Sequence, residues 1–420
     1  MRYLWLAGAI GLAVSVAPAQ QLRVSGLPAG PEGLTAYSVS NDGQLVVGYG
    51  WNQYFVLYPV AWTPGQVPFV LSAPLVNSLA DEAYGVSGDG STIVGVTRHP
   101  TNYYNYPTVW RLTEGSWTYQ HLPVPQPSDG RARAASNDGR VVVGQTMPMG
   151  RYNIFPARWR ETASGWQLTD AFSLGCPFGG IATGVTADGE WVIGWACEGS
   201  TYYTRAFVAR SASEITVLPL SPPDNSSQAW GISANGDVIV GWSYITGSDP
   251  AVPRACRWRK VGNNWVHERL PALRDTLESY AYAVSADGRV IVGYDFTTAR
   301  YYRALIWIDG QVHVMQSLYS ALVPWNFYLS YAYDVSANGR YVVGTIYNGN
   351  ARRFEMFWLD RGCQVPGDAN GDGQVNNADL LLVLFAFGQT GSNLPADLNR
   401  DGQVNNADLL LVLFNFGANC

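Results

Sequence analysis

The chain has 420 residues, of which 47% are hydrophobic and 14% charged, and its formal net charge is −6. The hydrophobic fraction excludes a disordered chain, and the acidic balance without a basic stripe argues against nucleic-acid binding. The 45 glycines and the 13% of aromatic residues favour many short strands joined by glycine-rich turns. We therefore expect an all-β body.

Residues 1–19 have the pattern of a secretory signal peptide. Arg2 supplies a positive charge, an apolar stretch runs from Leu4 to Val16, and the small residue Ala19 ends a cleavage site. The apolar stretch is too short to span a bilayer as an anchor. We predict a mature protein that is secreted, extracellular or at the cell surface, without a membrane span.

One phrase occurs seven times in the body, from AYSVSNDGQLVVG (36–48) to AYDVSANGRYVVG (332–344). The turn glycines of the phrase are 47 to 52 residues apart and are Gly43, Gly90, Gly139, Gly189, Gly236, Gly288 and Gly339. Each phrase predicts a β-hairpin, because the Asp-Gly or Asn-Gly pair supplies the positive φ angles of a tight turn. A third strand, such as the one ending at Trp62, and a fourth strand follow.

Four strands in each repeat are typical of the blades of a β-propeller. The seventh repeat has no fourth strand after Trp358, whereas residues 20–28 have the character of a fourth strand without a repeat before it. This segment would complete the last blade and remove the exposed edges of an open array. We predict a seven-bladed β-propeller over residues 20–361, with an N-terminal strand closing the last blade. An open β-solenoid does not explain the offset.

The phrase resembles the HAF family of extracellular repeats over roughly residues 30–360. That family is named for a sequence pattern. The resemblance therefore implies secretion and a repeat architecture, and it implies no activity.

No residues of the body form a recognisable catalytic motif. The repeated turn aspartates are replaced by Asn235 and Asn338 in two repeats, which suits a turn and would spoil a carboxylate mechanism. The histidines lie in different repeats without a shared register: His99, His121, His267 and His313. We name no catalytic residue and favour a non-enzyme, although a site assembled across blades would leave no motif.

Aromatic residues recur in the loops between second and third strands, which emerge on one face of an up-and-down propeller. They could stack on sugar rings or form an aromatic protein interface, or they could fill gaps between blades. The candidate ligand face consists of Trp51, Tyr54, Tyr103, Tyr104, Tyr202, Tyr203, Trp242, Tyr301 and Tyr302.

Residues 362–420 contain two near-identical segments 29 residues apart, at 368–388 and 397–417. Each has oxygen ligands at positions 1, 3, 5, 7, 9 and 12 of a calcium loop, with glycine at position 6. The first set is Asp368, Asn370, Asp372, the carbonyl of Gln374, Asn376 and Asp379. The second set is Asp397, Asn399, Asp401, the carbonyl of Gln403, Asn405 and Asp408. Hard oxygen donors at this spacing predict two bound Ca²⁺ ions.

A calcium loop followed by one helix, repeated once, resembles a dockerin type I module. We expect the helices at Leu380 to Phe387 and Leu409 to Phe416. The resemblance implies a cohesin-like partner that contacts the loop ends and helices, at Asn377, Ala378, Leu381, Leu384, Phe385, Asn406, Ala407, Leu410, Leu413 and Phe414. The loop ends lack the hydroxyl pair of cellulosomal dockerins, which makes a cellulosomal partner doubtful and leaves self-association as an alternative.

Five cysteines are disulfide candidates in an oxidising compartment. Cys363 and Cys420 bracket the C-terminal module, and Cys176 and Cys197 lie in neighbouring elements of one repeat. Cys256 takes an apolar strand position, so we expect a buried free thiol there.

Three functional readings follow from these features. The first is a non-catalytic binding or structural propeller, with a possible glycan ligand, attached to a partner through the calcium module. The second is a dockerin-borne polysaccharide-active hydrolase or lyase. The third is a self-assembling surface-layer or filament protein.

Overall fold

The structure is a computed structural model that describes residues 20–27, 32–73, 81–98, 101, 104–125, 128–148, 154–199, 203–245, 252–362, 367–369, 374–391, 394, 396–399 and 402–418. The predicted signal peptide lies outside this range. The chain divides into two compact units, Leu22–Asp360 and the C-terminal Arg361–Cys420 together with the residues before Leu22.

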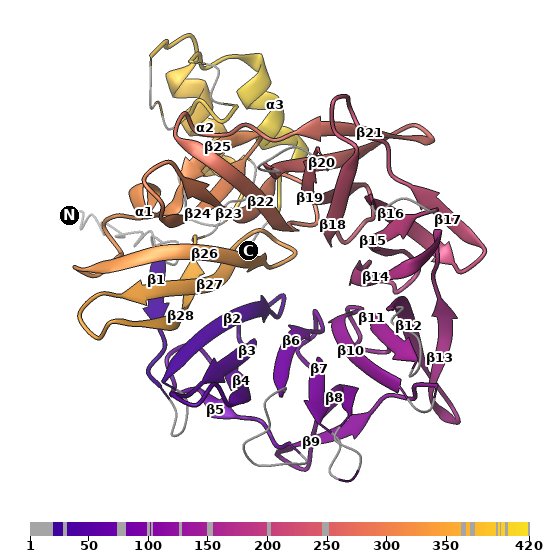
Figure 1. Ribbon diagram of the computed structural model, residues 1–420. Helices are drawn as coiled ribbons and strands as arrows, with labels where there is room; N and C mark the ends of the chain where they lie inside the picture. Colours follow the sequence, from indigo (N-terminus) through magenta and orange to yellow (C-terminus); the bar gives the residue numbers. More distant parts are fainter. Residues whose placement is uncertain are drawn as a thin grey trace, which may run out of the picture. The chain divides into compact units, whose positions relative to one another are not determined.

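Leu22–Asp360 forms a ring of seven four-stranded antiparallel sheets (Figure 1). This confirms the predicted seven-bladed propeller. Blade 1 contains β2 (Gly33–Val39), β3 (Val46–Trp51), β4 (Leu57–Trp62) and β5 (Phe69–Val70). Blade 2 contains β6 (Glu82–Val86), β7 (Thr92–Arg98), β8 (Asn105–Thr113) and β9 (Ser116–His121). Blade 3 contains β10 (Ser128–Ala135), β11 (Val141–Pro148), β12 (Phe155–Thr162) and β13 (Gly165–Ala171).

The remaining blades follow in chain order around the ring. Blade 4 contains β14 (Gly175–Val185), β15 (Val192–Glu198), β16 (Thr204–Ser211) and β17 (Glu214–Val217). Blade 5 contains β18 (Ser226–Ile232), β19 (Val238–Tyr244), β20 (Arg254–Val261) and β21 (Asn264–Arg269). Blade 6 contains β22 (Thr276–Val284), β23 (Val290–Thr297), β24 (Tyr302–Ile308) and β25 (Gln311–Val314). The short helix α1 (Met315–Leu318) leads to blade 7, with β26 (Phe327–Val335), β27 (Tyr341–Asn348) and β28 (Arg353–Asp360).

Blade 7 takes its fourth strand from the N-terminal end of the unit. The strand β1 (Gln21–Val24) lies beside β28 in the order β1-β28-β27-β26. Ser25 fastens its end, because its N–H donates to the carbonyl of Met356 at 3.0 Å and its Oγ accepts from the N–H of Met356 at 3.0 Å. The predicted closure by an N-terminal strand is therefore confirmed.

Every inner strand carries a β-bulge at the same place in the phrase, directly after a buried alanine such as Ala36. Directly before the bulge, a backbone carbonyl lies against the last glycine of the phrase. A Cβ on Gly48 would lie 1.9 Å from the oxygen of Thr35, and the six equivalent glycines would clash at 1.9–2.1 Å. This explains the glycine that ends each Val-Val-Gly-like strand. A bulge re-aims side chains, and here it turns one residue of each inner strand toward the axis.

The hairpin turns differ from the expected tight turn with two positive φ angles. Only the glycine has a positive φ, as at Gly43 (71°), and its N–H donates to the carbonyl of Ser40 at 3.0 Å. The acidic or amide side chain instead holds the turn. Asp42 Oδ1 accepts the N–H of Gln44 at 2.9 Å and the hydroxyl of Ser40 at 2.6 Å, and the same pair of bonds recurs in all seven blades. Asparagine has the same acceptor oxygen, which explains Asn235 and Asn338 and confirms their structural role.

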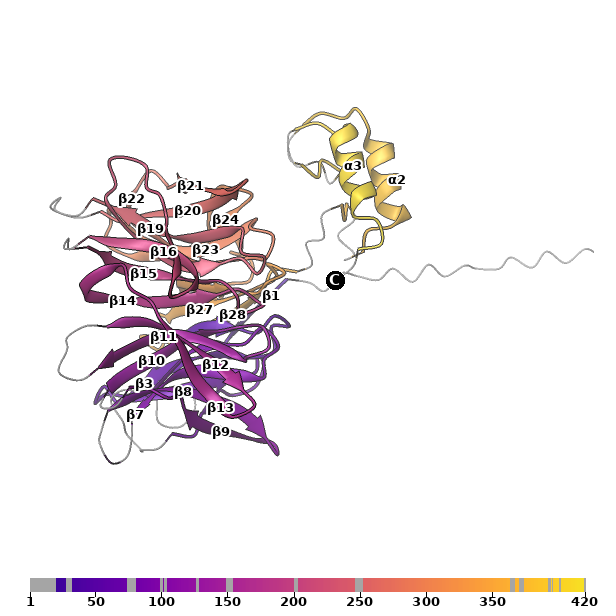
Figure 2. The same cartoon turned by 90° about the vertical axis from the view of Figure 1, so that its right-hand side faces the viewer.

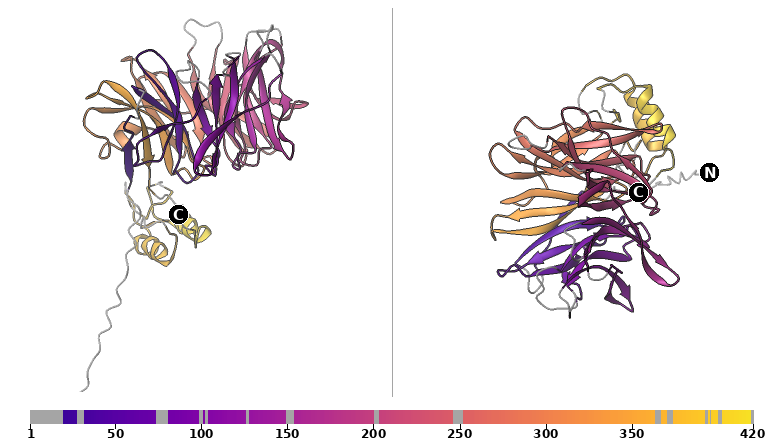
Figure 3. Two further views of the ribbon diagram at one scale, coloured as in Figure 1. Left: turned by 90° about the horizontal axis from the view of Figure 1, so that it is seen from below. Right: turned by 45° about the vertical axis from the view of Figure 1, so that its right-hand side comes forward.

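Third-strand tryptophans fill the space between neighbouring blades, whose strands Figures 2 and 3 show from the side. Five of them are at most 1% exposed: Trp62, Trp110, Trp159, Trp258 and Trp307. The indole N–H of Trp110 donates to the carbonyl of Ser72 at 2.7 Å, and that of Trp258 to Pro219 at 2.7 Å. These carbonyls follow the fourth strand of the preceding blade, so each such bond ties two blades together.

The C-terminal unit contains two repeats built around the helices α2 (Asn377–Ala386) and α3 (Asn406–Phe414), which lie side by side in Figure 2. Each helix begins three residues before the expected leucine, because Asn376 and Asn405 cap it. Each repeat also bonds to the end of the other. The N–H of Val375 donates to the carbonyl of Ala418 at 2.8 Å, and that of Val404 to Gln389 at 3.0 Å. The two repeats therefore form one interlocked unit.

Candidate functional sites

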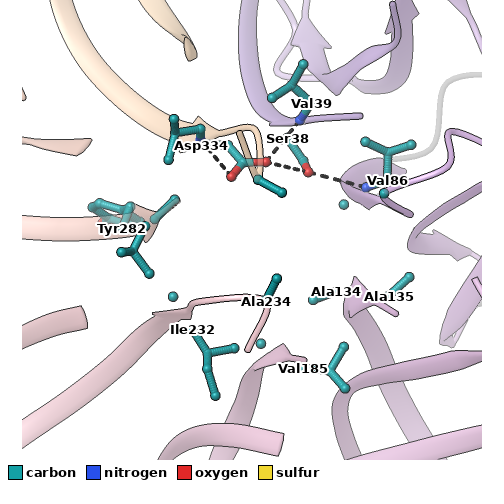
Figure 4. Close-up of a pocket in the computed structure, with 18 of the residues that line it drawn as sticks. Ser38, Val39, Val86, Ala134, Ala135, Val185, Ile232, Ala234, Tyr282 and Asp334 are labelled. Atoms are coloured by element: carbon teal, nitrogen blue, oxygen red, sulfur yellow. Dashed lines mark hydrogen bonds between the residues drawn. The ribbon is translucent and has the colours of Figure 1, made fainter. Parts of the chain in front are cut away.

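A cavity of about 370 Å³ lies on the propeller axis, and all seven inner strands contribute to its lining (Figure 4). The bulged residues form its upper ring and are Tyr37, Tyr84, Arg133, Thr183, Trp230, Tyr282 and Tyr333. The next residues of the strands are small except for one carboxylate, and are Ser38, Gly85, Ala134, Gly184, Gly231, Ala283 and Asp334. The site therefore exists only when the ring is closed.

Five aromatic side chains from consecutive blades form a continuous arc around the cavity, which we call the aromatic rim: Trp230, Tyr282, Tyr333, Tyr37 and Tyr84. Their ring centroids are 5.3, 5.2, 5.1 and 5.8 Å apart in this order. Burial raises the pKa of these tyrosines well above the ordinary value, so their hydroxyls stay protonated. The rim is therefore a neutral aromatic surface.

The aromatic rim continues to the outside of the propeller. Tyr331 stacks on Tyr333 at 5.7 Å, and Tyr302 lies 5.1 Å from Tyr331. Tyr302 is 45% exposed. Aromatic surface thus leads from solvent to the cavity.

Arg133 follows Tyr84 around the ring. Its Cζ lies 4.2 Å from the centroid of the Tyr84 ring, which is a cation–π distance. Among the described residues it has no ion pair or hydrogen bond, and its Nε is buried without an acceptor. The neighbouring Arg131 is different, because it donates to the hydroxyl of Tyr84 at 3.1 Å and lies 4.0 Å from Glu82.

Asp334 bridges blade 7 and blade 1. Its Oδ2 accepts the hydroxyl of Ser38 at 2.8 Å and the N–H of Val39 at 3.0 Å, and its Oδ1 accepts the N–H of Val335 at 2.8 Å (Figure 4). Burial raises the pKa of Asp334 from 3.8 to about 6, although these three donors oppose the shift. The carboxylate is ionised at neutral pH and is held by the two blades that close the ring.

We expect Asp334 to make propeller stability depend on pH. Because the folded pKa lies above the unfolded value, the ionised group opposes folding above pH 6, and the cost is relieved as pH falls through 6 toward 4. Relative to an Asp334→Asn variant, the wild-type free energy of unfolding should rise by about 1.4 kcal/mol between pH 7.5 and pH 5. Urea denaturation of both proteins at both pH values measures the free energies of unfolding. The contributions of other carboxylates are the same in the two proteins and cancel in the comparison. An equal change in both proteins would contradict the assignment.

An amide bridge joins two asparagines of the cavity lining. Asn41 Nδ2 donates to Asn137 Oδ1 at 2.9 Å, across the intervening blade. The residue between them is Gly88, where a Cβ would lie 2.2 Å from Asn137 Oδ1 and 2.4 Å from Asn41 Nδ2. A glycine is needed there for the bridge to form.

The two charged residues of the cavity were not singled out in the sequence. An alignment of the seven repeated phrases could have identified them, because Arg133 is the one charged residue at the second position of the phrase and Asp334 the one charged residue at the third. Their position in the cavity depends on the bulge of the inner strand, and the bulge could not be predicted from the sequence.

The predicted ligand-face aromatics occupy different environments. Tyr54 is 72% exposed, Tyr301 and Tyr203 are also exposed, and Trp51 and Tyr104 are half-buried. Trp242 is buried and stacks on Trp230 at 5.2 Å, which is the gap-filling role left open above. Tyr103 and Tyr202 lie outside the described residues.

The described histidines do not meet. His121 contacts Thr97 at 2.9 Å in blade 2, His267 accepts the N–H of Ser221 at 3.1 Å in blade 5, and His313 lies on β25. His99 lies outside the described residues. Each of these three histidines has its own local surroundings, so they form no shared site with one another.

Of the cysteines, Cys256 is a buried free thiol, as predicted, and burial raises its pKa. Cys197 is also buried. The side chains of Cys176, Cys363 and Cys420 lie outside the described set, so both disulfide pairings stay predictions.

The C-terminal loops hold carboxylates in fixed positions. Asp379 and Asp408 are fully buried, and each accepts backbone N–H groups from its own loop. Asp379 accepts from Ala369 and Asn376 at 2.8 Å, and Asp408 accepts from Leu398 at 2.7 Å and Asn405 at 2.9 Å. Such preorganised carboxylates, deep in a small unit, suit a hard cation.

The second loop also shows the expected turn. The N–H of Gly402 donates to Asp397 Oδ2 at 2.9 Å, and Gly402 has a φ of 87°. Asn376 and Asn405 each accept the N–H two residues on, at 2.7 and 2.8 Å, and so cap the helices as well. Asn370, Asp372 and Asp401 lie outside the described residues. The two calcium sites therefore stay predictions, in which the described loop oxygens are held by backbone N–H groups.

The helices bury little of their apolar surface. The apolar core of the unit consists of Ala369, Val375, Val383, Ala396, Val404 and Val412, so each helix buries one valine fully. The predicted partner-binding leucines and phenylalanines are exposed in matching amounts: Leu381 and Leu410 (49% and 46%), Leu384 and Leu413 (48% each), and Phe385 and Phe414 (81% each). Asn377, Ala378, Asn406 and Ala407 are exposed beside them.

The fold defines a seven-bladed propeller protein with a small unit of two loop–helix repeats. Residues 366–413 match the dockerin type I domain family, which confirms this part of the resemblance. Dockerin type I domains in general bind calcium and attach their carriers to cohesin partners. No curated protein matches the chain, and the HAF-like resemblance stays a prediction.

Several solved propellers are similar to this chain in fold. An oligogalacturonate lyase from Vibrio parahaemolyticus is 11% identical, with 83% of this chain and 98% of that chain covered and a TM-score of 0.50. An oligogalacturonate lyase in complex with manganese is 12% identical, with 82% and 98% covered and a TM-score of 0.52. At these identities the likeness concerns the fold alone. No helix among the described residues is long and apolar enough to cross a membrane.

Proposed function

We propose that this is a secreted, non-catalytic binding protein whose propeller takes a glycan ligand and whose dockerin unit attaches it, with two bound Ca²⁺ ions, to a cohesin-like partner. The observation that carries the proposal is the pair of matching exposed apolar helix faces within a dockerin match. Phe385 and Phe414 are each 81% exposed. Large exposed apolar patches mark interaction surfaces in soluble proteins.

The calcium loops and the docking faces are coupled through the helices. Asp379 and Asp408 anchor the loops and belong to the first turns of α2 and α3. Cation binding at the loops therefore supports the helices that present the exposed faces.

We expect Ca²⁺-dependent binding of the full chain to a cohesin from a panel of cohesin domains, measured by calorimetry with and without chelator. Because the two faces carry the same residues, one substitution leaves the other face intact. The double variant Phe385→Ser/Phe414→Ser should weaken binding at least 100-fold, since anchors of this kind dominate interfaces. The control Leu112→Ser/Val261→Ser changes two exposed apolar residues of the propeller and should have no effect.

Three outcomes would redirect the proposal. Binding that chelation leaves unchanged would contradict calcium-dependent docking. Calcium-dependent self-assembly of the purified chain would support the surface-layer reading instead. New reducing ends or unsaturated products from polysaccharides would establish the enzyme reading.

A further inference from the structure

We propose that the axial cavity binds the carboxylate-bearing end of an acidic saccharide, with Arg133 pairing with the carboxylate and the aromatic rim holding the sugar ring. This inference deepens the ligand part of the proposed function and is independent of docking. Three observations support it, from the guanidinium, the rim and the remaining cavity wall.

Arg133 points to an anionic ligand. Its Nε is buried without an acceptor, and within the described chain its charge interacts with that of Glu82 through space, without an ion pair or hydrogen bond. Buried donors in folded proteins are nearly always satisfied, by the chain, a ligand or water, so this Nε can take an acceptor from outside the chain. A guanidinium offers a planar fork that matches a carboxylate with two parallel hydrogen bonds.

Asp334 is not that acceptor, and it limits the charge of the ligand. Its oxygens already accept hydrogen bonds from the Ser38 hydroxyl and from the backbone N–H groups of Val39 and Val335. With one guanidinium and one carboxylate in the same lining, the cavity is close to neutral and disfavours a doubly charged anion such as a phosphate monoester. A single carboxylate group is the anion that fits this balance.

The rest of the cavity suits a sugar. The aromatic rim offers flat apolar faces, and aromatic contacts extend outward to Tyr302. Neutral polar groups also line the cavity, at Ser38, Thr183 and the Asn41–Asn137 bridge. Aromatic faces with a few placed polar groups, in a volume of about 370 Å³, are the features of a small-ligand site.

The test uses the full chain and two matched trisaccharides, a trigalacturonate and a neutral galactotriose, in titration calorimetry. We expect the wild type to prefer the acidic trisaccharide at least tenfold. Arg133→Gln should lower affinity for the acidic trisaccharide 10- to 100-fold and leave the neutral one unchanged. Arg133→Lys keeps the positive charge without the planar fork, and its affinity for the acidic trisaccharide should lie between those of the wild type and Arg133→Gln. The control Arg140→Gln alters an exposed turn of the same blade and should bind as wild type.

The outcomes separate this inference from the broader proposal. Equal binding of acidic and neutral trisaccharides by the wild type would overturn the inference and leave glycan binding standing. No binding of either would overturn both. Unchanged acidic binding by a folded Arg133→Gln variant, with folding checked by thermal melting, would overturn the role of Arg133. Inorganic phosphate and benzoate are tested beside them, and tighter binding of either would exclude a sugar acid as the preferred ligand.

Discussion

Chelation of calcium should unfold the C-terminal unit and leave the propeller folded. The unit has a core of six small or medium apolar residues among those described, which is too small to stabilise it alone. A ligand at 100 times its Kd stabilises a folded unit by about 2.7 kcal/mol for each site. Two sites therefore supply most of the stability of the unit, and differential scanning calorimetry of the full chain should show one transition lost and one unmoved.

Matched substitutions test the source of this effect. Asp379→Asn/Asp408→Asn removes two buried negative charges, keeps the side-chain volume, and should reduce calcium affinity by 10- to 100-fold or more, in line with the loss of a charged ligand from each site. The control is Asp287→Asn, because Asn235 and Asn338 already occupy the equivalent turns. A propeller transition that moved with chelation, or a C-terminal transition that did not, would contradict the assignment.

Removal of the closing strand should have the second large effect. In a chain that lacks residues 1–27, blade 7 loses β1 and the edge of β28 becomes exposed. Leu22 and Val24 pack against the cluster containing Phe357 and Leu359, and such side chains contribute about 1.5–3 kcal/mol each when fully buried. Since both are only partly buried, we expect a loss of about 3 kcal/mol, together with association through the free edge.

The comparison chain for this experiment lacks residues 1–19 and keeps β1. Urea denaturation measures stability, and size-exclusion chromatography measures association. A peptide of residues 20–27 added in trans should restore both by strand addition, whereas a scrambled peptide should not. Equal stability of the two chains would show that β1 does not close the ring.

Local patterns in the sequence determined the blade count, the closing strand and the dockerin unit. Gly43 and its six equivalents mark turns within a few residues, and the predicted calcium positions from Asp368 to Asp379 lie within one loop, so each pattern can be read from spacing alone. The sequence also shows a glycine at position 48 and at the equivalent position of every other repeat, but it does not show why a glycine is required there. That reason is a clash with the carbonyl of Thr35, which lies directly before the bulge of the inner strand.

Only the tertiary structure decided what lies on the axis. Arg133 and Asp334 are single residues in separate repeats, and Asp334 is 296 residues from Ser38, to which it is bonded. Closure of seven blades brings them to one cavity, and a bulge in each inner strand turns the side chains of the upper ring toward the axis. The same closure buried Trp242 while leaving Tyr54 exposed, a distinction that depends on neighbouring blades rather than on the loop sequence. Long-range contacts of this kind have no periodic signature, because each occurs once.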